Sequence, residues 1–579
     1  MRNYNARLRS KIIALFYICT LIFFILSVRV VYVQGVENQR FKKLALSQHV
    51  DKEEIPAIRG RILDRNNIAL AESIELLSVA ANPREIKDKE HAAKAISESL
   101  GIDYKEVLDK LNSRLTFVWI GRKVEYENVN KLKAKKIKGV FTIKESNGKR
   151  FYTQGRLASH ILGYTGIDDQ GLDGVEAIYE PYLKGAPGTV EAEMDNYGRV
   201  LPHGNVKITP AVPGHNIVLS IDANIQFAAE RELDKTLKEY NAKRGTVVVM
   251  EVNTGEILAL ANKPDFKPQF YYDFPELNLR NRAVSDMFEP GSTFKVFLAA
   301  AALDSGKITM DEKFYCGNSI NIGGWEICNA NDGLSSKTGK ETIKEIITYS
   351  FNVGTASVSQ KIGKEVFYKY INDFGFSKLT DVDLPGESEG LLLNKADWSP
   401  SSLATISFGQ GISVTPVQVV AALSAIANGG KLLKPHIVKA VVDKDGNTVK
   451  EFAPKVVRRV ISFKTSLELT QIMRQVVEKG TGKRAQIPGY LVAGKTGTAQ
   501  MAEGGSYSSN KYIASFMGFA PAEEPRIAVL VKIEEPQGII WGGYVAGPVF
   551  KEVAKAALWH MGIPPSMPVE NESKNAKKS

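Results

Sequence analysis

Cysteine and histidine are scarce in this chain of 579 residues, which has three cysteines and seven histidines. The histidines stand singly, and no Cys-x-x-Cys or His-x-x-x-His spacing occurs, so the usual ligand patterns of a zinc site are missing. The phosphate-binding loop Gly-x-x-x-x-Gly-Lys-Ser/Thr and the dinucleotide fingerprint are missing too. The sequence therefore predicts no metal and no nucleotide cofactor.

Long uncharged apolar runs are also rare. The exception is residues 12–28, after which the apolar character continues past Arg29 to residue 33. About 20 apolar residues are enough to cross a bilayer as a helix. A cleavable signal peptide is the alternative, but no small-x-small cleavage site follows the run. We therefore expect a retained, single-pass anchor in the cell membrane at 12–33.

Positive charges gather before this run, and they predict a cytoplasmic tail, 1–11, with the rest of the chain on the outer face of the membrane. These charges are Arg2, Arg7, Arg9 and Lys11. Over the whole chain the net charge is +11, but the basic residues are spread and no nucleic-acid motif accompanies them. We therefore expect no nucleic-acid partner. The basic run 131–138 is interpreted as a solvated face, with attraction to anionic polymers or lipid head groups as the alternative.

The strongest chemical signal surrounds Ser292. A Pro-Gly pair precedes this serine, which is a favoured residue at a helix start, and Gly306 ends the expected helix about four turns later. The residues between them are apolar almost all round, which predicts a helix inside a core. Lys295 lies three residues after Ser292 and shares its face of the helix. A desolvated lysine can act as the base that activates a serine, and the helix dipole favours the developing alkoxide.

Two further motifs follow in a fixed order. Ser350-Phe351-Asn352 falls between two helix-like stretches, 340–349 and 353–362. Lys495-Thr496-Gly497-Thr498 begins a run of strand-like segments that includes 513–519 and 527–533. The order Ser-x-x-Lys, Ser-x-Asn, Lys-Thr-Gly resembles the signature of penicillin-binding proteins and class A β-lactamases.

The region before these motifs resembles the non-catalytic domain of class B penicillin-binding proteins. The matching boxes are 59–66, 155–164 and 171–176. Where the family usually has Tyr-Pro before the second box, this chain has Tyr152-Thr153. We expect the boxes to form turns and interdomain salt bridges, and His160 to pack or hydrogen-bond rather than to catalyse. The resemblance covers nearly the whole chain, from the anchor to about residue 562.

The resemblance implies an α+β fold with three parts after the cytoplasmic tail. A transmembrane helix is followed by an extended mixed pedestal or dimerisation domain, 34–210. A transpeptidase domain, 211–562, then contains an antiparallel sheet flanked by helices. We expect the polar, lysine-rich end, 563–579, to be a disordered tail.

The same resemblance implies a role for each motif residue. Ser292 would attack the penultimate D-alanine carbonyl of a peptidoglycan stem peptide, and Lys295 would take its proton. Ser350 would relay a proton to the departing D-alanine, stabilised by Lys495, while Asn352 orients Lys295 and the substrate amide. The remaining motif residues would bind substrate, and these are Thr496, Gly497 and Thr498. The backbone N–H groups of Ser292 and Thr498 would hold the oxyanion.

The implied activity is a serine D,D-transpeptidase that cross-links stem peptides and is acylated by β-lactams. The proportions resemble the division and sporulation group, because the pedestal is short and lacks a large insertion. No glycosyltransferase-like domain precedes the pedestal, so the expected partners are a separate membrane glycosyltransferase of the shape, elongation, division and sporulation family, and divisome or spore-septum proteins. Two alternatives stay open: a protein that hydrolyses or senses β-lactams, and a mainly structural member of a wall-building complex.

The cysteines leave one question open. Cys19 lies in the apolar run and is expected to be inert. Cys316 and Cys328 flank Gly323-Gly324 almost symmetrically, so a hairpin that turns there would bring them roughly opposite each other. An oxidising compartment favours a disulfide between them, and two separate thiols are the alternative.

Overall fold

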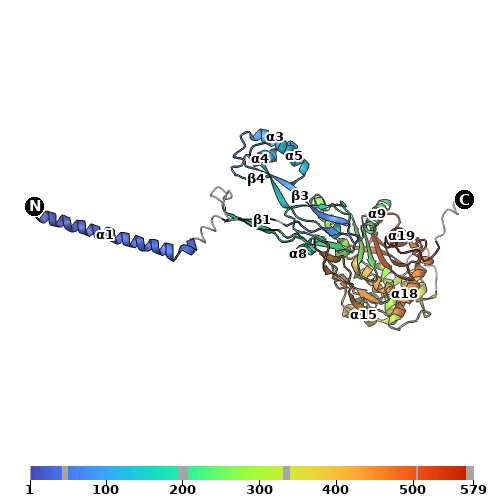
Figure 1. Ribbon diagram of the computed structural model, residues 1–579. Helices are drawn as coiled ribbons and strands as arrows, with labels where there is room; N and C mark the ends of the chain where they lie inside the picture. The colour runs from blue at the N-terminus through green and yellow to red at the C-terminus, as the bar shows by residue number, and fades with distance from the viewer. Residues whose placement is uncertain are drawn as a thin grey trace. The chain divides into compact units, whose positions relative to one another are not determined.

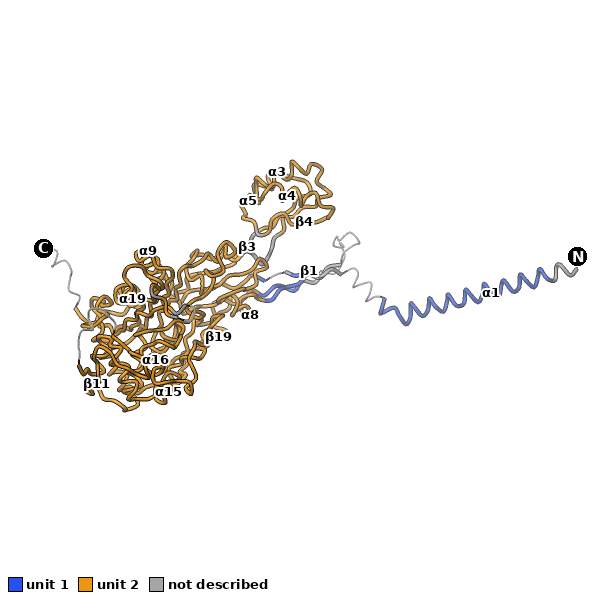
Figure 2. The backbone as a smooth tube through the Cα atoms, turned by 180° about the vertical axis from the view of Figure 1, so that it is seen from behind, with its two compact units in different colours: residues 1–57, 186–212 blue, residues 58–185, 213–579 orange. Residues whose placement is uncertain are grey.

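The computed structural model describes residues 2–41, 50–55, 57–193, 206–329, 339–503 and 506–568. The chain forms two compact units, one of residues 1–57 and 186–212 and the other of residues 58–185 and 213–579 (Figure 2). Of the expected C-terminal tail, 563–579, the part after residue 568 lies outside the described residues.

The first unit contains the apolar helix and a small sheet. Helix α1 (Arg2–Gly35) includes a segment, 7–35, that is long and apolar enough to cross a membrane. Nearly all side chains of this segment are exposed, as a lipid-facing surface requires. An antiparallel sheet in the order β1-β6-β7 completes the unit, with strands β1 (Val50–Ile55), β6 (Gly188–Glu193) and β7 (Val206–Thr209).

The N-terminal part of the second unit carries three helices beside long strands (Figure 1). Their bounds are α3 (Lys89–Leu100), α4 (Tyr104–Leu111) and α5 (Tyr126–Ala134), and the strands are β3 (Ala69–Ala81), β4 (Val118–Val124) and β5 (Val140–Tyr152). Asp88 and Asp103 cap the first two helices by accepting a backbone N–H within the first turn. The buried faces meet in a separate small apolar core that includes Ile96 and Val107.

A buried ion-pair centre joins two of the sequence boxes. The Arg59 guanidinium lies 2.7 Å from one Glu176 carboxylate oxygen, and Arg150 lies 2.6 Å from the other. All three side chains are almost fully buried. Arg59 also pairs with Glu180, so this cluster ties together α7 (Gly174–Ile178) and α8 (Glu180–Leu183). Removal of any single member would leave an uncompensated buried charge and would strongly destabilise the fold.

The second box packs against the segment that follows β10 (Ile257–Lys263). His160, in α6 (Ser159–Leu162), is buried edge-on against Phe266, and its Nε2 lies 2.8 Å from the Asn278 carbonyl oxygen. Burial lowers the pKa of His160 to about 4, so this imidazole is neutral at physiological pH. The Arg156 guanidinium pairs with Asp265 at 2.9 Å. These contacts fix how the box lies against the rest of its unit.

A seven-stranded sheet runs across the expected pedestal and transpeptidase segments. Its order is β19-β18-β8-β2-β3-β4, with β5 paired to β3. The connection is the parallel pair β2 (Ile62–Leu63) and β8 (Asn216–Leu219). Strands β18 (Val438–Val442) and β19 (Thr448–Glu451) extend the far edge. The predicted domain boundary at 210/211 stays a prediction, because residues on its two sides share this sheet.

The catalytic motifs lie around a five-stranded antiparallel sheet in the order β10-β9-β23-β22-β21. The strands are β9 (Arg244–Glu251), β10 (Ile257–Lys263), β21 (Ala493–Glu503), β22 (Ser506–Ala520) and β23 (Ile527–Glu534). Helices α9 (Ala223–Glu239) and α19 (Gly542–His560) share an apolar core with this sheet. The expected strands 513–519 and 527–533 lie within β22 and β23, and the α+β class with helices flanking an antiparallel sheet is confirmed.

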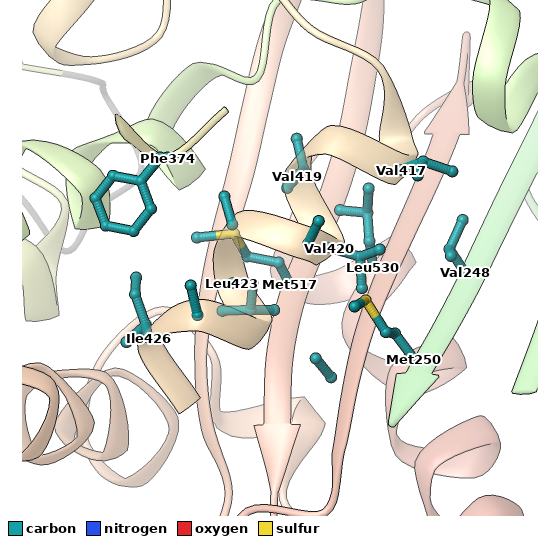
Figure 3. Close-up of a cluster of buried hydrophobic side chains, with 14 of the residues drawn as sticks. Val248, Met250, Phe374, Val417, Val419, Val420, Leu423, Ile426, Met517 and Leu530 are labelled. Atoms are coloured by element: carbon teal, nitrogen blue, oxygen red, sulfur yellow. The ribbon is translucent and has the colours of Figure 1, made fainter. Parts of the chain in front are cut away.

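A second helical layer brings the Ser292 region to this sheet. Its central helix, α17 (Pro416–Ala427), is buried on all sides, and Thr415 begins it with a capping box. Val420 and Leu423 of α17 lie near Met517 and Leu530 of the sheet (Figure 3). Helices α12 (Lys295–Asp304) and α18 (Phe463–Glu478) belong to the same core.

Shorter elements surround this core. The helices are α10 (Glu276–Leu279), α11 (Arg282–Ser285), α13 (Ile343–Tyr349), α14 (Asn352–Ile362), α15 (Lys364–Asp373) and α16 (Pro400–Ser407). The 3-10 turns are η1 (Pro268–Asp273), η2 (Gly291–Phe294), η3 (Lys395–Asp397) and η4 (Lys483–Ala485). The strands are β11 (Lys313–Tyr315), β12 (Ser319–Ile322), β13 (Trp325–Cys328), β14 (Lys340–Thr342), β15 (Leu391–Leu392), β16 (Ile412–Ser413), β17 (Lys431–Leu433) and β20 (Val456–Arg459).

Two sequence expectations about these elements need correction. The α-helix expected from Ser292 begins at Lys295, because the preceding residues form η2, a tighter 3-10 turn. The helix expected over 340–349 begins at Ile343, because residues 340–342 pair with β11 as strand β14 before Thr342 caps the helix.

Candidate active site

Ser292 lies on η2, a turn held between two other segments. The Gly291 N–H donates to the Gly409 carbonyl oxygen at 3.1 Å. Gly291 has φ of +54°, and a Cβ there would lie 3.1 Å from the Ala499 Cβ on β21. A residue with a side chain would strain this turn, so glycine lets it approach the strand closely. The turn therefore fixes Ser292 beside β21.

Lys295 begins the buried helix α12 and is completely buried. Its Nζ donates to the Ser350 carbonyl oxygen at 2.6 Å and to the Asn352 Oδ1 at 2.7 Å, and it lies 3.3 Å from the Ser350 Oγ. The helix thus delivers the ammonium group to the second motif, which comes from another part of the chain.

Ser350 has a left-handed backbone, with φ of 64° at the C-terminal cap of α13. This conformation is uncommon for a residue other than glycine, and such strain gathers at functional sites. The turn aims the Ser350 carbonyl and hydroxyl at Lys295 and lets α14 begin at Asn352. The Asn352 Nδ2 then donates to the Cys328 carbonyl oxygen at 3.0 Å.

Lys495 reaches the same hydroxyl from the sheet. It is completely buried on β21, and its Nζ donates to the Ser350 Oγ at 2.9 Å and to the Thr496 carbonyl oxygen at 3.1 Å. The Ser350 hydroxyl therefore lies between the Nζ atoms of two buried lysines. A hydroxyl in this position can pass a proton between groups on its two sides.

The rest of the third motif lies along the wall of the site. The Thr496 Oγ1 lies 2.7 Å from the Thr481 Oγ1, and the Thr498 Oγ1 accepts from the Gly542 N–H at 3.1 Å. At Gly497 a Cβ would lie 2.4 Å from the Ser515 Oγ and 2.9 Å from Thr293. Only glycine fits here without displacing a neighbour, so β21 passes directly against the turn that carries Ser292.

These motif residues surround one cavity of about 450 Å³. Its lining includes Ser292, Ser350, Asn352, Thr496 and Thr498. Lys295, Lys495 and Gly497 lie behind this lining, where the first two contact Ser350 and the third packs under the serine turn. The structure therefore brings all eight sequence-predicted site residues together.

Other residues of the cavity wall were not predicted as site residues. These are Phe408, Gln410, Thr481, Trp541, Gly542, Gly543 and Tyr544, together with Gly291 and Ala499. Phe408 and Gln410 fall in the segment 407–411, and its Gly409-Gln410-Gly411 pattern was the available signal. No fixed spacing relates Thr481 or Trp541 to the three motifs, and we find no signal that would have identified them.

Glu289 is a partly buried carboxylate next to the serine turn. Its Oε1 accepts from the Gly411 N–H at 2.8 Å and from the Tyr507 hydroxyl at 3.2 Å. Its Oε2 is buried without a hydrogen-bond partner among the described residues. Burial raises the pKa of Glu289, because the two hydrogen bonds offset only part of the desolvation.

Cys316 and Cys328 are free thiols in this structure. The expected hairpin exists as β12 and β13, but Cys328 pairs with Ser319 rather than opposite Cys316. Cys316 precedes the hairpin and is buried, and burial raises the pKa of its thiol to about 12. Among the residues described here, no group of three or more histidine, cysteine or acidic side chains could hold a metal ion.

Comparison with protein-family models agrees with this geometry. Residues 245–555 match the penicillin-binding protein transpeptidase domain, and residues 54–219 match the penicillin-binding protein dimerisation domain. Stage V sporulation protein D of Bacillus subtilis is 36% identical over 573 residues, which cover 98% of this chain and 88% of that protein. The chain belongs to the class B penicillin-binding proteins.

Other members of this penicillin-binding protein family agree along nearly the whole chain. The peptidoglycan D,D-transpeptidase FtsI of Escherichia coli is 32% identical, over 93% of this chain and 89% of that protein. A solved structure of penicillin-binding protein 3 from Mycobacterium tuberculosis, complexed with aztreonam, has a TM-score of 0.68 and 29% identity and covers 89% of this chain and 99% of that one. Family membership and the apolar helix α1 together give this penicillin-binding protein a membrane location.

Proposed function

We propose that this penicillin-binding protein is a serine D,D-transpeptidase of septal or spore wall synthesis, with Ser292 as its nucleophile. The observation that carries the proposal is the placement of the Ser350 hydroxyl between Lys295 and Lys495, at the wall of the cavity that Ser292 lines. One relative is named a stage V sporulation protein and another a peptidoglycan D,D-transpeptidase, and these names support the process and the activity.

In the first half of the reaction, the Ser292 Oγ attacks the carbonyl of the penultimate D-alanine. Lys295, which is completely buried and whose Nζ lies 3.3 Å from the Ser350 Oγ, takes the hydroxyl proton. The C–N bond then breaks, and Ser350 passes a proton to the departing D-alanine while Lys495 stabilises this relay. The products are an acyl-enzyme ester and free D-alanine.

Substrate binding uses the β21 side of the cavity. Thr496 and Thr498 bind the terminal carboxylate beside Lys495, and Gly497 keeps the strand close to the serine turn. The N–H groups of Ser292 and Thr498 receive the oxyanion, and each such donor contributes about 3 kcal/mol in comparable enzymes. Asn352 orients Lys295 and the substrate amide, because it already accepts a hydrogen bond from that lysine.

A cross-linking enzyme is favoured over a β-lactam hydrolase by the cavity wall. Rapid deacylation needs a carboxylate that activates water, and the described residues that line the cavity include no aspartate or glutamate. Glu387, which lies between the second and third motifs in the sequence, accepts backbone and hydroxyl hydrogen bonds from Thr380. The acyl-enzyme therefore persists until an amine attacks it.

The membrane arrangement follows from the charges around α1. We propose a cytoplasmic N-terminus with the catalytic part outside, because the basic residues precede the apolar run. The proposed domains remain a pedestal, 34–210, and a transpeptidase domain, 211–562. The proposed partners are a membrane glycosyltransferase of the shape, elongation, division and sporulation family and proteins of the divisome or spore septum.

A donor that carries acyl-D-alanyl-D-alanine tests this assignment. The full chain in detergent should release D-alanine and join the acyl group to an added amine, and Ser292→Ala should lose both products. In serine acyl-transfer enzymes, loss of the nucleophile lowers the rate by about 10⁶-fold. Equal rates in the wild type and in a folded Ser292→Ala chain would reject Ser292 as the nucleophile.

A further inference from the structure

A pocket separate from the catalytic cavity opens between the end of helix α15 and the strands β17 and β20. It has a volume of about 350 Å³. None of the described residues that line it lines the catalytic cavity as well. Its lining includes the buried apolar residues Phe374, Ala421 and Leu432. The pocket can therefore hold a ligand of its own.

The loop that follows helix α15 forms one side of the pocket and is held in place by the folded chain. The Gln418 Nε2, on the buried helix α17, donates to the Lys378 carbonyl oxygen at 2.8 Å. The Glu387 carboxylate accepts from the backbone N–H groups of Thr380 at 2.7 Å and of Asp381 at 3.1 Å. The pocket is thus formed before any ligand binds.

The two strands on the other side present one face to the pocket. Leu432 of β17 lies directly opposite Arg458 of β20, so their side chains share a face. The Leu432 Cδ2 would lie 3.3 Å from a Cβ at Gly375. The Arg458 guanidinium donates to the carbonyl oxygens of Asn372 at 2.9 Å and of Asp373 at 3.3 Å. Both side chains therefore point toward the end of α15, where the pocket lies.

Two lysines continue this face. Lys434 lies two residues after Leu432, so its side chain is on the same side of the ladder. Its N–H donates to the Lys455 carbonyl oxygen at 2.9 Å, which makes the two lysines directly opposite cross-strand neighbours. Neither side chain makes an ion pair or a hydrogen bond with any part of the chain that the structure describes. Like charges in such a pair repel each other, and a bound anion offsets this repulsion.

The charges on the pocket wall select the ligand. The basic lining residues are Lys378, Lys434, Lys455 and Arg458, and Asp381 is the only acidic one among the described residues there. A carboxylate has a single charge and would leave one lysine of the pair uncompensated. A phosphate monoester carries between about 1.5 and 2 negative charges at neutral pH and has three acceptor oxygens for the two ammonium groups and Arg458. The buried apolar part of the lining fits an apolar group on the ester.

We propose that this pocket binds a phosphate monoester that carries an apolar group, with Lys434, Lys455 and Arg458 as its phosphate ligands. The ligand binds there without a chemical step. The site is independent of the transpeptidase activity proposed above, because the pocket and the catalytic cavity share no lining residue among those described.

Phenyl phosphate is a probe with the required charge and apolar group. Isothermal titration calorimetry of the full chain in a nonionic detergent, at neutral pH and low salt, should show that it binds. For Lys434→Gln and for Lys455→Gln we expect the dissociation constant to rise about fivefold, the size of one partly exposed charge interaction. As a matched control, Lys444→Gln removes an exposed lysine from the β18–β19 turn and should leave the dissociation constant unchanged. No binding to the wild type, or equal affinities in all three variants, would overturn the site.

A variant that binds more tightly separates the loss of a ligand contact from misfolding. Asp381→Asn removes the only acidic side chain of the described lining and should lower the dissociation constant about threefold. Asparagine tolerates the left-handed backbone at this position, where φ is 59°. Weaker binding by a folded Asp381→Asn chain would contradict the proposed anion site.

Three further titrations locate the probe and define its chemistry. Addition of a penicillin should leave the dissociation constant unchanged, and competition would place the probe in the catalytic cavity. Benzoate has an apolar ring but one charge and should bind about fivefold more weakly, whereas equal affinity would contradict the need for a second charge. Dihexanoylphosphatidylglycerol carries a lipid head group with one charge and should also bind more weakly. Tighter binding of this lipid would assign the pocket to a head group and overturn the monoester.

Discussion

The catalytic cavity and the ion-pair centre of the pedestal both bury basic side chains, but they surround them differently. Arg59 and Arg150 each lie within 2.7 Å of a Glu176 carboxylate oxygen. Lys295 and Lys495 instead donate to hydroxyl, amide and carbonyl oxygens of Ser350, Asn352 and Thr496. Carboxylates fix a cation in its charged state, whereas neutral acceptors leave a proton easier to move. The first arrangement stabilises a fold and the second can perform acid–base chemistry.

The largest effect is expected on the catalytic side of this comparison. In Lys295→Ala, acylation by a penicillin should slow by about 10²- to 10⁴-fold, because a positioned general base contributes that much. The fluorescence of a labelled penicillin bound to the chain, followed over time, measures the rate. Thermal unfolding of the same sample shows whether the chain is folded. A folded Lys295→Ala chain that is acylated at the wild-type rate would show that Lys295 is not the general base.

In the pedestal, a substitution should lower the free energy of unfolding and leave the acylation rate unchanged. Glu176→Gln leaves Arg59 and Arg150 without their shared carboxylate, and breaking a buried ion pair costs about 3–5 kcal/mol in the free energy of unfolding. Denaturant unfolding of the variant measures this loss. As a control, Lys369→Ala removes an exposed pair with Asp373 on one helix and should cost only about 0.3–0.5 kcal/mol. If Glu176→Gln slowed acylation in chains that remain folded, the ion-pair centre would affect catalysis as well as folding stability, and the comparison would fail.

The smallest effect is expected at Glu289, a partly buried acid beside the serine turn. Burial raises its pKa above the ordinary value of 4.5, so the folded chain keeps this proton to a higher pH than the unfolded chain does. Its contribution to stability is complete below 4.5 and is lost as the pH rises through the folded pKa. Glu289→Gln stays neutral, so its melting temperature should gain on that of the wild type as the pH rises from 4.5. A difference that is constant with pH would contradict this titration.

The residues that gather around the cavity could be predicted from the sequence because each of the three motifs has a fixed internal spacing. It could not supply the distances between them: Ser350 meets Lys495 only because a left-handed turn and a sheet strand converge from positions 145 residues apart. The sequence could not predict the partners of Arg59 either, since Glu176 is 117 residues away along the chain. Such contacts depend on tertiary packing, which local patterns do not contain.

The same limit explains the errors in the local predictions. The Pro-Gly pair, Gly306 and the apolar run between them placed the helix of the Ser292 region correctly. They could not distinguish its first 3-10 turn from an α-helix, since both are compatible with the same apolar run. Symmetry around Gly323-Gly324 predicted the β12–β13 hairpin but not its register, which pairs Cys328 with Ser319. A hairpin's register depends on its turn and its packing as well as on the residues that flank it.

Mass spectrometry of the full chain after incubation with a penicillin tests the central claim most directly. The account predicts one long-lived adduct on the peptide that contains Ser292, and no adduct in a folded Ser292→Ala chain. An adduct on another residue, or an unmodified wild-type chain, would contradict the assignment of Ser292 and its two lysines as the catalytic centre.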